Sequence, residues 1–230
     1  MFQAFIRRKS RLYKRYLGYR EPGERRVSEE DEITALIMGP LEYLPPEAQV
    51  LIWRTILEWH QPDPPLPFPN TSVKDAQIRF WPRTTIEPDL LVELEWMCGT
   101  RRIILVEFKW NAPLSGQYQL HRQWKEYLSK EQKKNAIHLF IGPETSPAIN
   151  AISESNIWKG RLVARSWSNI ASSLRKIKLN PNRGLSVWST QVISFLKLLN
   201  LNSFQGFDHL QPPSNPAIKG NNVFFRSAPK

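Results

Sequence analysis

Asp89, Glu107 and Lys109 are the residues whose types and spacing could carry out chemistry. Asp89 follows Pro88, and Glu107 and Lys109 flank Phe108. Carboxylate oxygens are ligands that Mg²⁺ prefers, and a bound divalent cation polarises a phosphate and activates a water molecule. A lysine beside them can orient or deprotonate that water and stabilise the developing negative charge. The three residues therefore predict metal-dependent phosphodiester hydrolysis, with Asp89 and Glu107 as metal ligands.

A β-hairpin is predicted to bring these three side chains together. Its arms, residues 89–96 and 102–110, are rich in Leu, Val, Ile and aromatic side chains, and residues 98–100 supply a turn that contains glycine. With this turn, Asp89 lies opposite Lys109. Because alternate side chains of a strand share a face, we expect the two carboxylates and the ammonium group to form one cluster.

Two further acids of the first arm, Glu93 and Glu95, share the face of Ile103 and Leu105 in the same register. A charged side chain is costly to bury without a partner. We therefore expect this end of the hairpin to contain a β-bulge or to lie at a solvated edge of the sheet.

The Pro88-Asp89 pair, the spacing to Glu107 and the Glu107-Phe108-Lys109 triplet resemble the PD-(D/E)xK superfamily of restriction-endonuclease-like nucleases. The resemblance implies an α/β fold with a restriction endonuclease-like core, in which helices flank a mixed β-sheet. It also implies an Mg²⁺-dependent endodeoxyribonuclease, in which Mn²⁺ can replace Mg²⁺. By the same analogy we expect a role in restriction or anti-phage defence, with a mobile element or repair as alternatives.

An acidic helix is predicted to begin after Ser28 and to end near residue 40. Ser28 suits the N-cap, Asp31 stands at the capping-box position, and acids in the first turn suit the helix dipole. The first helix of many PD-(D/E)xK proteins points an acidic residue at the metal. By this resemblance Glu30 is a third metal ligand, with Glu29 as the alternative.

A second polar helix is predicted from about residue 117 to residue 129, directly after the hairpin. Gln119 and Gln123 are four residues apart and share its polar face with Arg122. The resemblance implies that a residue such as Gln119 borders the metal-bound water or the phosphate. Arg122 is the predicted phosphate contact on this helix.

Positive charge is concentrated near the N-terminus. The chain has 32 Lys and Arg against 21 Asp and Glu, a net charge of +11, which favours a polyanionic partner, and DNA is the expected one. Residues 1–26 are predicted to form a basic arm, either an amphipathic helix on the phosphate backbone or a solvated segment. The expected DNA contacts in this arm are Arg7, Arg8, Lys9, Arg11, Lys14 and Arg15.

Residues 27–210 are predicted to form one nuclease-like domain, and residues 211–230, rich in Pro, Asn and Gly, an extended tail. In addition to the hairpin, the sequence predicts strands at 78–81, 135–141 and 160–167. It predicts helices at 47–59, 148–158, 168–179 and 185–199. The strand-helix-strand order after the hairpin adds two strands to it and predicts a mixed sheet.

The remaining features predict a cytoplasmic protein. Cys98 is the single cysteine, so no internal disulfide can form, and the four histidines do not have the spacing of a zinc site. No apolar run approaches the roughly 18 to 20 residues that a membrane-spanning helix needs. The N-terminal segment also lacks the apolar core of a signal peptide.

One alternative function and several partners stay open. The chain could be a non-catalytic nucleic-acid-binding or scaffolding subunit of a larger defence or mobile-element complex. Its possible protein partners are the other proteins of such a system, or a second copy of the chain in a homodimer. Trp110 and Trp124, near the predicted site, are the candidates for stacking on bases. Three clustered charges favour the enzyme, because only a metal would offset buried carboxylates.

Overall fold

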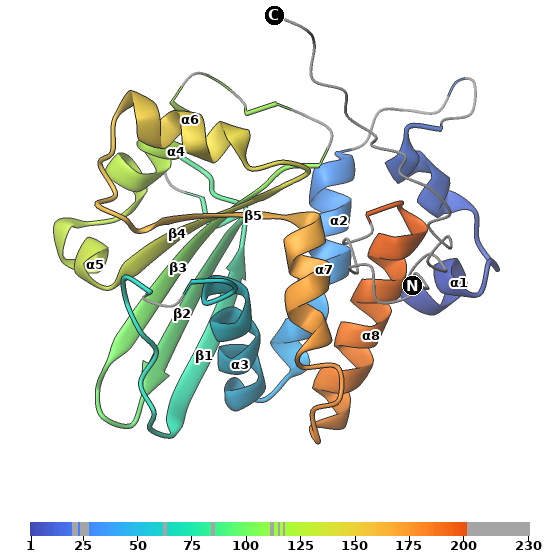
Figure 1. Ribbon diagram of the computed structural model, residues 1–230, viewed down its shortest axis with the longest axis horizontal. Helices are drawn as coiled ribbons and strands as arrows, with labels where there is room; N and C mark the ends of the chain where they lie inside the picture. The colour runs from blue at the N-terminus through green and yellow to red at the C-terminus, as the bar shows by residue number, and fades with distance from the viewer. Residues whose placement is uncertain are drawn as a thin grey trace, which may run out of the picture.

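A five-stranded mixed sheet is the centre of the fold (Figure 1). The computed structural model describes residues 1–19, 23, 28–61, 64–83, 86–110, 113–114, 116 and 118–201. The strands are β1 (Val73–Phe80), β2 (Leu90–Trp96), β3 (Arg101–Phe108), β4 (Ala136–Gly142) and β5 (Leu162–Ser166). They lie in sequence order, with β1, β2 and β3 antiparallel and β3, β4 and β5 parallel. The predicted α/β class with a mixed sheet flanked by helices is confirmed.

The hairpin forms as predicted, but its turn lies one residue earlier than expected. Trp96 N donates to Thr100 O at 3.0 Å, so the loop is residues 97–99, and Gly99 takes its last position with φ of 80°. That left-handed conformation favours glycine at the end of a three-residue loop. Leu91 therefore pairs with Leu105. With Asp89 opposite Lys109, as predicted, Leu91 would have paired with Glu107, so the predicted register is wrong by two residues. A shift of two preserves the faces, so the site residues still share one face.

Glu93 and Glu95 lie at a solvated end of the sheet, which was one of the two expected arrangements. Glu93 pairs with Arg79 of the neighbouring strand β1. Glu95 lies 2.7 Å from Lys74 Nζ and 3.2 Å from Arg101. A register shift between Val73 and Asp75 adds an irregularity at the same end. Cross-strand cations thus offset both carboxylates where water can reach them.

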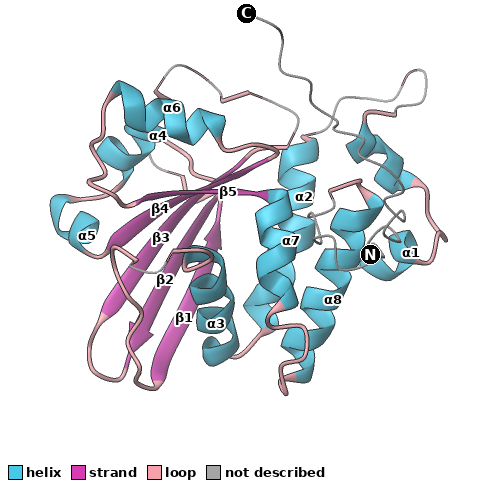
Figure 2. Ribbon diagram, in the orientation of Figure 1, coloured by secondary structure: helices cyan, strands magenta, loops and turns pink. Residues whose placement is uncertain are grey.

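Helices cover both faces of the sheet (Figure 2). The larger core lies under α2 (Glu29–Met38), α3 (Pro46–Leu57), α7 (Trp167–Arg175) and α8 (Arg183–Leu198). The smaller core lies under α4 (Gln119–Arg122), its π-helical continuation η3 (Gln123–Tyr127), and α6 (Ser146–Glu154). The short helix α5 (Lys130–Lys134) precedes β4. A sheet buried on both faces explains the nearly continuous apolar sequence of β4.

The first residues of the chain pack onto this core. Helix α1 (Phe2–Ile6) lies against α8, where the rings of Phe5 and Phe195 stack with centroids 5.8 Å apart. The 3₁₀-helix η1 (Leu12–Leu17) buries Tyr16 in the same cluster, and η2 (Gly39–Tyr43) extends α2. Most apolar side chains among the basic residues therefore face the protein core, whereas Leu12 is exposed. The tail 211–230 and Arg20, Arg25 and Arg26 of the predicted arm lie outside the described residues.

Among the helices in the described part of the chain, none combines the length and the apolar character needed to cross a bilayer.

Candidate metal centre

Three carboxylates from separate segments converge at one end of β3. Glu30 lies in the first turn of α2, Asp89 directly precedes β2, and Glu107 is in β3. One oxygen from each lies within 4.8 Å of the other two. Glu107 is 1% exposed, Asp89 is 9% exposed, and Glu30 is partly buried. The structure thus brings together the three acids that the sequence analysis assigned to the metal.

Helix α2 positions Glu30 through its N-terminus. The Ser28 side chain accepts a hydrogen bond from Asp31 N at 3.4 Å, so the predicted N-cap is confirmed and the helix begins at Glu29. Glu30 then reaches across to the chain that follows β3. Its Oε1 accepts from Lys109 Nζ at 2.7 Å, and its Oε2 accepts from Trp110 N at 3.2 Å. Glu30, and not its neighbour Glu29, supplies the helix oxygen of this cluster.

Lys109 is the cation of the cluster, and it is 4% exposed. Its Nζ lies 2.7 Å from both Glu30 Oε1 and Glu107 Oε1. Its backbone is held on both sides, since Lys109 N donates to Ile141 O at 2.7 Å and Trp167 Nε1 donates to Lys109 O at 2.9 Å. Burial alone would lower the pKa of Lys109, but the Glu107 and Glu30 carboxylates outweigh it and raise the pKa above its usual value. The side chain is therefore a protonated donor at neutral pH.

Two glutamines hold both oxygens of Glu107. Gln119 Nε2 donates to Oε1 and Gln123 Nε2 donates to Oε2, each at 2.6 Å. Gln119 was predicted at the site, whereas Gln123 was placed only on the polar face of the helix. Its four-residue spacing from Gln119 was the signal that could have identified it. At Gln123 the helix changes from α to π geometry, a feature that is frequent at functional sites.

Asp89 is held in a different protonation state from an ordinary aspartate. Its Oδ2 accepts from Phe108 N at 2.6 Å, a bond that ties the start of β2 to the end of β3. Burial, followed by the nearby Glu107 carboxylate, raises the pKa of Asp89 to about 8. Burial also raises the pKa of Glu30. Burial away from water is the largest cause of both pKa shifts.

The donor set of the cluster fits a hard divalent cation. Three carboxylates face a single ammonium group, so the fully ionised cluster has an excess of negative charge. Oxygen ligands of this kind suit Mg²⁺ or Mn²⁺, whereas zinc sites of proteins are rich in His and Cys. A cation would offset both the burial and the Glu107 charge that raise the pKa of Asp89. Asp89, Glu107 and Glu30 are the residues that would hold it.

The predicted DNA contacts lie outside this cluster. Arg122 is exposed and pairs with Glu126 at 3.3 Å along its own helix. Arg7, Arg8, Lys9, Arg11 and Lys14 are exposed, whereas Arg15 is partly buried against Glu32 at 3.1 Å. Glu32 thus holds Arg15 in place, and it also accepts from the hydroxyl of Tyr16 at 3.1 Å.

Trp110 and Trp124 are not placed for stacking on bases, which corrects that expectation. Each is 5% exposed. Trp110 packs against Trp167, and its Nε1 donates to Tyr16 O at 2.9 Å. Trp124 stacks on His138, with ring centroids 6.1 Å apart. Both rings are used for packing in the core.

No protein-family model, no curated protein and no solved structure matches this chain.

Proposed function

We propose that the protein is an Mg²⁺-dependent nuclease that hydrolyses phosphodiester bonds of DNA, with a restriction endonuclease-like core of the PD-(D/E)xK type. One observation carries the proposal: Glu30, Asp89 and Glu107 come from separate segments and converge around Lys109. Three acids buried beside one cation are costly for a protein that does not use them. A bound divalent cation would offset the buried negative charge, which accounts for the cluster.

Each residue of the cluster has a role in such a reaction. A divalent cation held by the three carboxylates would polarise the phosphate and acidify a water molecule. Lys109, protonated and buried, donates to the negative charge that develops on the phosphate. Gln119 and Gln123 keep Glu107 in one orientation, since each binds one of its oxygens. The state of Lys109 favours charge stabilisation over proton abstraction.

The basic N-terminal segment supports DNA as the substrate. The N-terminal segment with the exposed Arg7, Lys9 and Arg11 is tied to the site, because Tyr16 O accepts from the indole of Trp110, the residue after Lys109. Exposed cations attract a polyanion and make its binding dependent on salt. The role in restriction or anti-phage defence is carried over from the resemblance alone.

Metal binding and cleavage of supercoiled DNA test the proposal together. Wild type should bind Mg²⁺ or Mn²⁺ in a calorimetric titration and nick the plasmid in its presence. Asp89→Ala should lose both, because it removes a metal ligand, while DNA binding in EDTA is retained. Glu93→Gln is the matched control, since Glu93 is an acid of the same strand β2 that pairs with Arg79 away from the site.

One result would contradict the nuclease activity, and another would contradict the proposed location of its active site. Absence of metal binding by folded wild type would favour the non-catalytic scaffold, in which the acids and Lys109 form only a structural ion-pair network. Cleavage by Asp89→Ala at the wild-type rate would place the active site elsewhere. Circular dichroism of each variant separates these outcomes from unfolding.

A further inference from the structure

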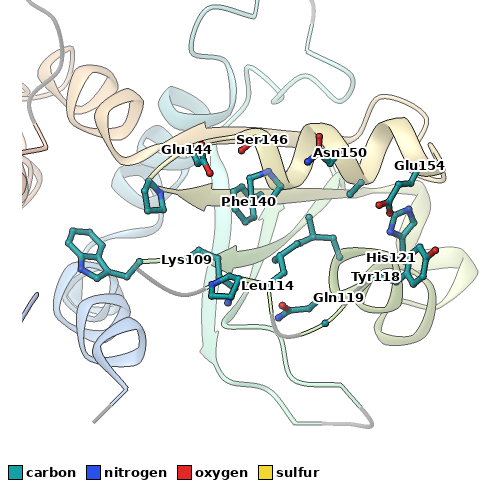
Figure 3. A pocket seen from close by; sticks show the side chains of 17 residues that line it. Lys109, Leu114, Tyr118, Gln119, His121, Phe140, Glu144, Ser146, Asn150 and Glu154 are labelled. Atoms are coloured by element: carbon teal, nitrogen blue, oxygen red, sulfur yellow. The ribbon is translucent and has the colours of Figure 1, made fainter. Parts of the chain in front are cut away.

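A groove of about 810 Å³ extends from Lys109 and Gln119 along the side of the sheet (Figure 3). Helix α6 forms one wall, from which Ser146, Asn150 and Glu154 face the groove at intervals of four residues. Tyr118 and His121 stand at the far end. The volume lies in the range of sites that hold a small molecule or one unit of a polymer.

The lining of the groove is apolar at its base and acidic at its rim. Phe140, Leu120 and Ala151 are buried side chains that line it. Glu144 and Glu154 are exposed at its edge, and neither pairs with a cation within the described ranges. Apolar surface suits a flat ring, and unpaired carboxylates suit a hydrogen-bond donor. A phosphate inside the groove would be repelled by both glutamates.

His121 adds another acceptor at the end of the groove. It is 3% exposed, and its Nε2 lies 3.0 Å from Ser155 O. A carbonyl oxygen only accepts, so Nε2 carries the hydrogen and Nδ1 is left as an acceptor. Nδ1 is buried and has no hydrogen-bond partner among the residues that the structure describes. A buried acceptor without a partner is costly and is commonly satisfied by a ligand or water.

We propose that the groove receives an unpaired nucleobase with an exocyclic amino group, that is cytosine, adenine or guanine, next to the phosphodiester bond at the metal centre. The inference rests on the proposed nuclease function, and it names the part of the substrate that the site reads. The apolar base of the groove covers the faces of the ring, and one of the two rim carboxylates accepts from the amino group, as Glu and Asp accept from cytosine N4. Thymine and uracil have no such amino group.

Unpaired bases are accessible in single strands or after extrusion from a duplex, which costs a few kcal/mol. The groove therefore favours substrates that contain single-stranded segments, ends or mismatches over continuous duplex. Continuity of the groove with Lys109 places the bound base adjacent to the scissile phosphate.

Binding of single-stranded oligo-dC and oligo-dT of equal length, followed by fluorescence anisotropy in EDTA, tests this inference without cleavage. Wild type should bind oligo-dC roughly tenfold more tightly than oligo-dT, as expected for one good contact to a base edge. Asn150→Trp should fill the groove and bring the ratio of the oligo-dC affinity to the oligo-dT affinity close to one. Ile149→Trp is the matched control, because Ile149 is the preceding residue of α6, is 53% exposed and does not line the groove.

A second variant changes the chemistry of the rim and leaves its shape. Glu144→Gln combined with Glu154→Gln should lower the dC to dT ratio, because amides donate as well as accept. Equal affinities of wild type for the two strands, or an unchanged ratio in Asn150→Trp, would overturn the inference. A base preference that depends on Asn150, in a protein that cuts nothing with Mg²⁺ or Mn²⁺, would instead reject the proposed nuclease and keep the base-binding groove.

Discussion

At the scale of single residues, Lys109 is where stability and chemistry meet. Its ammonium group contacts Glu30 and Glu107 at 2.7 Å, and water is largely excluded from all three side chains. Removing one partner of a buried ion pair leaves an uncompensated charge. Substitutions of Lys109 therefore affect folding stability and catalysis through the same contacts. Added Mg²⁺ can separate the two effects, because it can replace the lost positive charge without restoring the lysine.

Lys109→Met should abolish DNA cleavage and keep metal binding, because the three carboxylates remain. In metal-free buffer the variant should be destabilised by roughly 3–5 kcal/mol, since Glu107 loses its buried counter-charge. Added Mg²⁺ should restore much of that loss and raise the melting temperature more in the variant than in wild type. The measurements are thermal unfolding with and without Mg²⁺, and plasmid nicking. Lys74→Met, which removes an exposed pair with Glu95, is the control.

Gln123→Leu should cost about 1–3 kcal/mol of folding stability, because it leaves a buried oxygen of Glu107 without its donor. Gln119→Leu should cost less, since Gln119 is only partly buried and water can replace it. Urea unfolding of both variants compares the two costs. Equal effects would mean that Gln123 does not hold Glu107 in the way the hydrogen bond implies.

At the scale of elements, strand β4 shows how a polar side chain is accommodated in an apolar layer. His138 is completely buried, and its Nδ1 accepts from Trp158 Nε1 at 3.0 Å. Burial, with the neighbouring His121 as a smaller cause, lowers the pKa of His138 from 6.5 to about 3. The folded protein therefore keeps His138 neutral at pH values where the unfolded chain protonates it.

The titration of His138 predicts a loss of stability in acid. Between pH 6.5 and pH 3, His138 binds a proton in the unfolded chain but not in the folded one. Its contribution to the free energy of unfolding is therefore complete above pH 6.5 and is lost as the pH falls toward 3. From pH 6.5 to pH 5 the loss should be about 2 kcal/mol.

His138→Gln should remove this part of the pH dependence, because the amide oxygen can still accept from Trp158 and does not titrate. Urea unfolding at several pH values measures it, with His60→Asn as the control at an exposed histidine. A slope unchanged by His138→Gln would show that other groups cause the acid sensitivity.

At the scale of the whole molecule, the N-terminal segment combines two tasks. Phe2, Phe5 and Tyr16 are buried against α8, while the basic residues between them are exposed, apart from the partly buried Arg15. Deleting residues 1–26 would therefore remove part of the core as well as the charge. Neutralising exposed side chains tests the charge alone.

Changing Arg7, Lys9, Arg11 and Lys14 together to Gln should weaken DNA binding and flatten its salt dependence. The slope of log affinity against log salt should fall by up to about 3–4, since each lost phosphate contact contributes about 0.9. The control variant removes the same charge from exposed positions elsewhere, at Lys125, Lys130, Lys134 and Lys159. An equal effect of the two sets would indicate attraction by net charge and no preferred binding face. Anisotropy titrations over a range of salt concentrations provide the slopes.

The local elements and the identity of the site acids could be predicted from the sequence by itself. Two segments rich in Leu, Val, Ile and aromatic residues around a glycine-containing turn predicted the hairpin. Ser28 predicted the start of α2, and Asp89, Glu107 and Lys109 were placed on one face. These features depend on neighbours in the chain or across one turn, so short-range rules are sufficient. The one error in the hairpin, a turn displaced by a residue, arose because Gly99 needed the last loop position.

Only the tertiary structure decided which distant residues meet and in what state. Glu30 lies 79 residues from Lys109, and their contact depends on how α2 packs beside the end of β3. Gln123 binds Glu107 at the point where the helix changes to π geometry, and Trp110 is buried with its indole donating to Tyr16 O. The protonation of Asp89 depends on burial and on Glu107, which are properties of the folded environment. Residue types determine which chemistry is available, whereas packing determines the distances and the exclusion of water on which that chemistry depends.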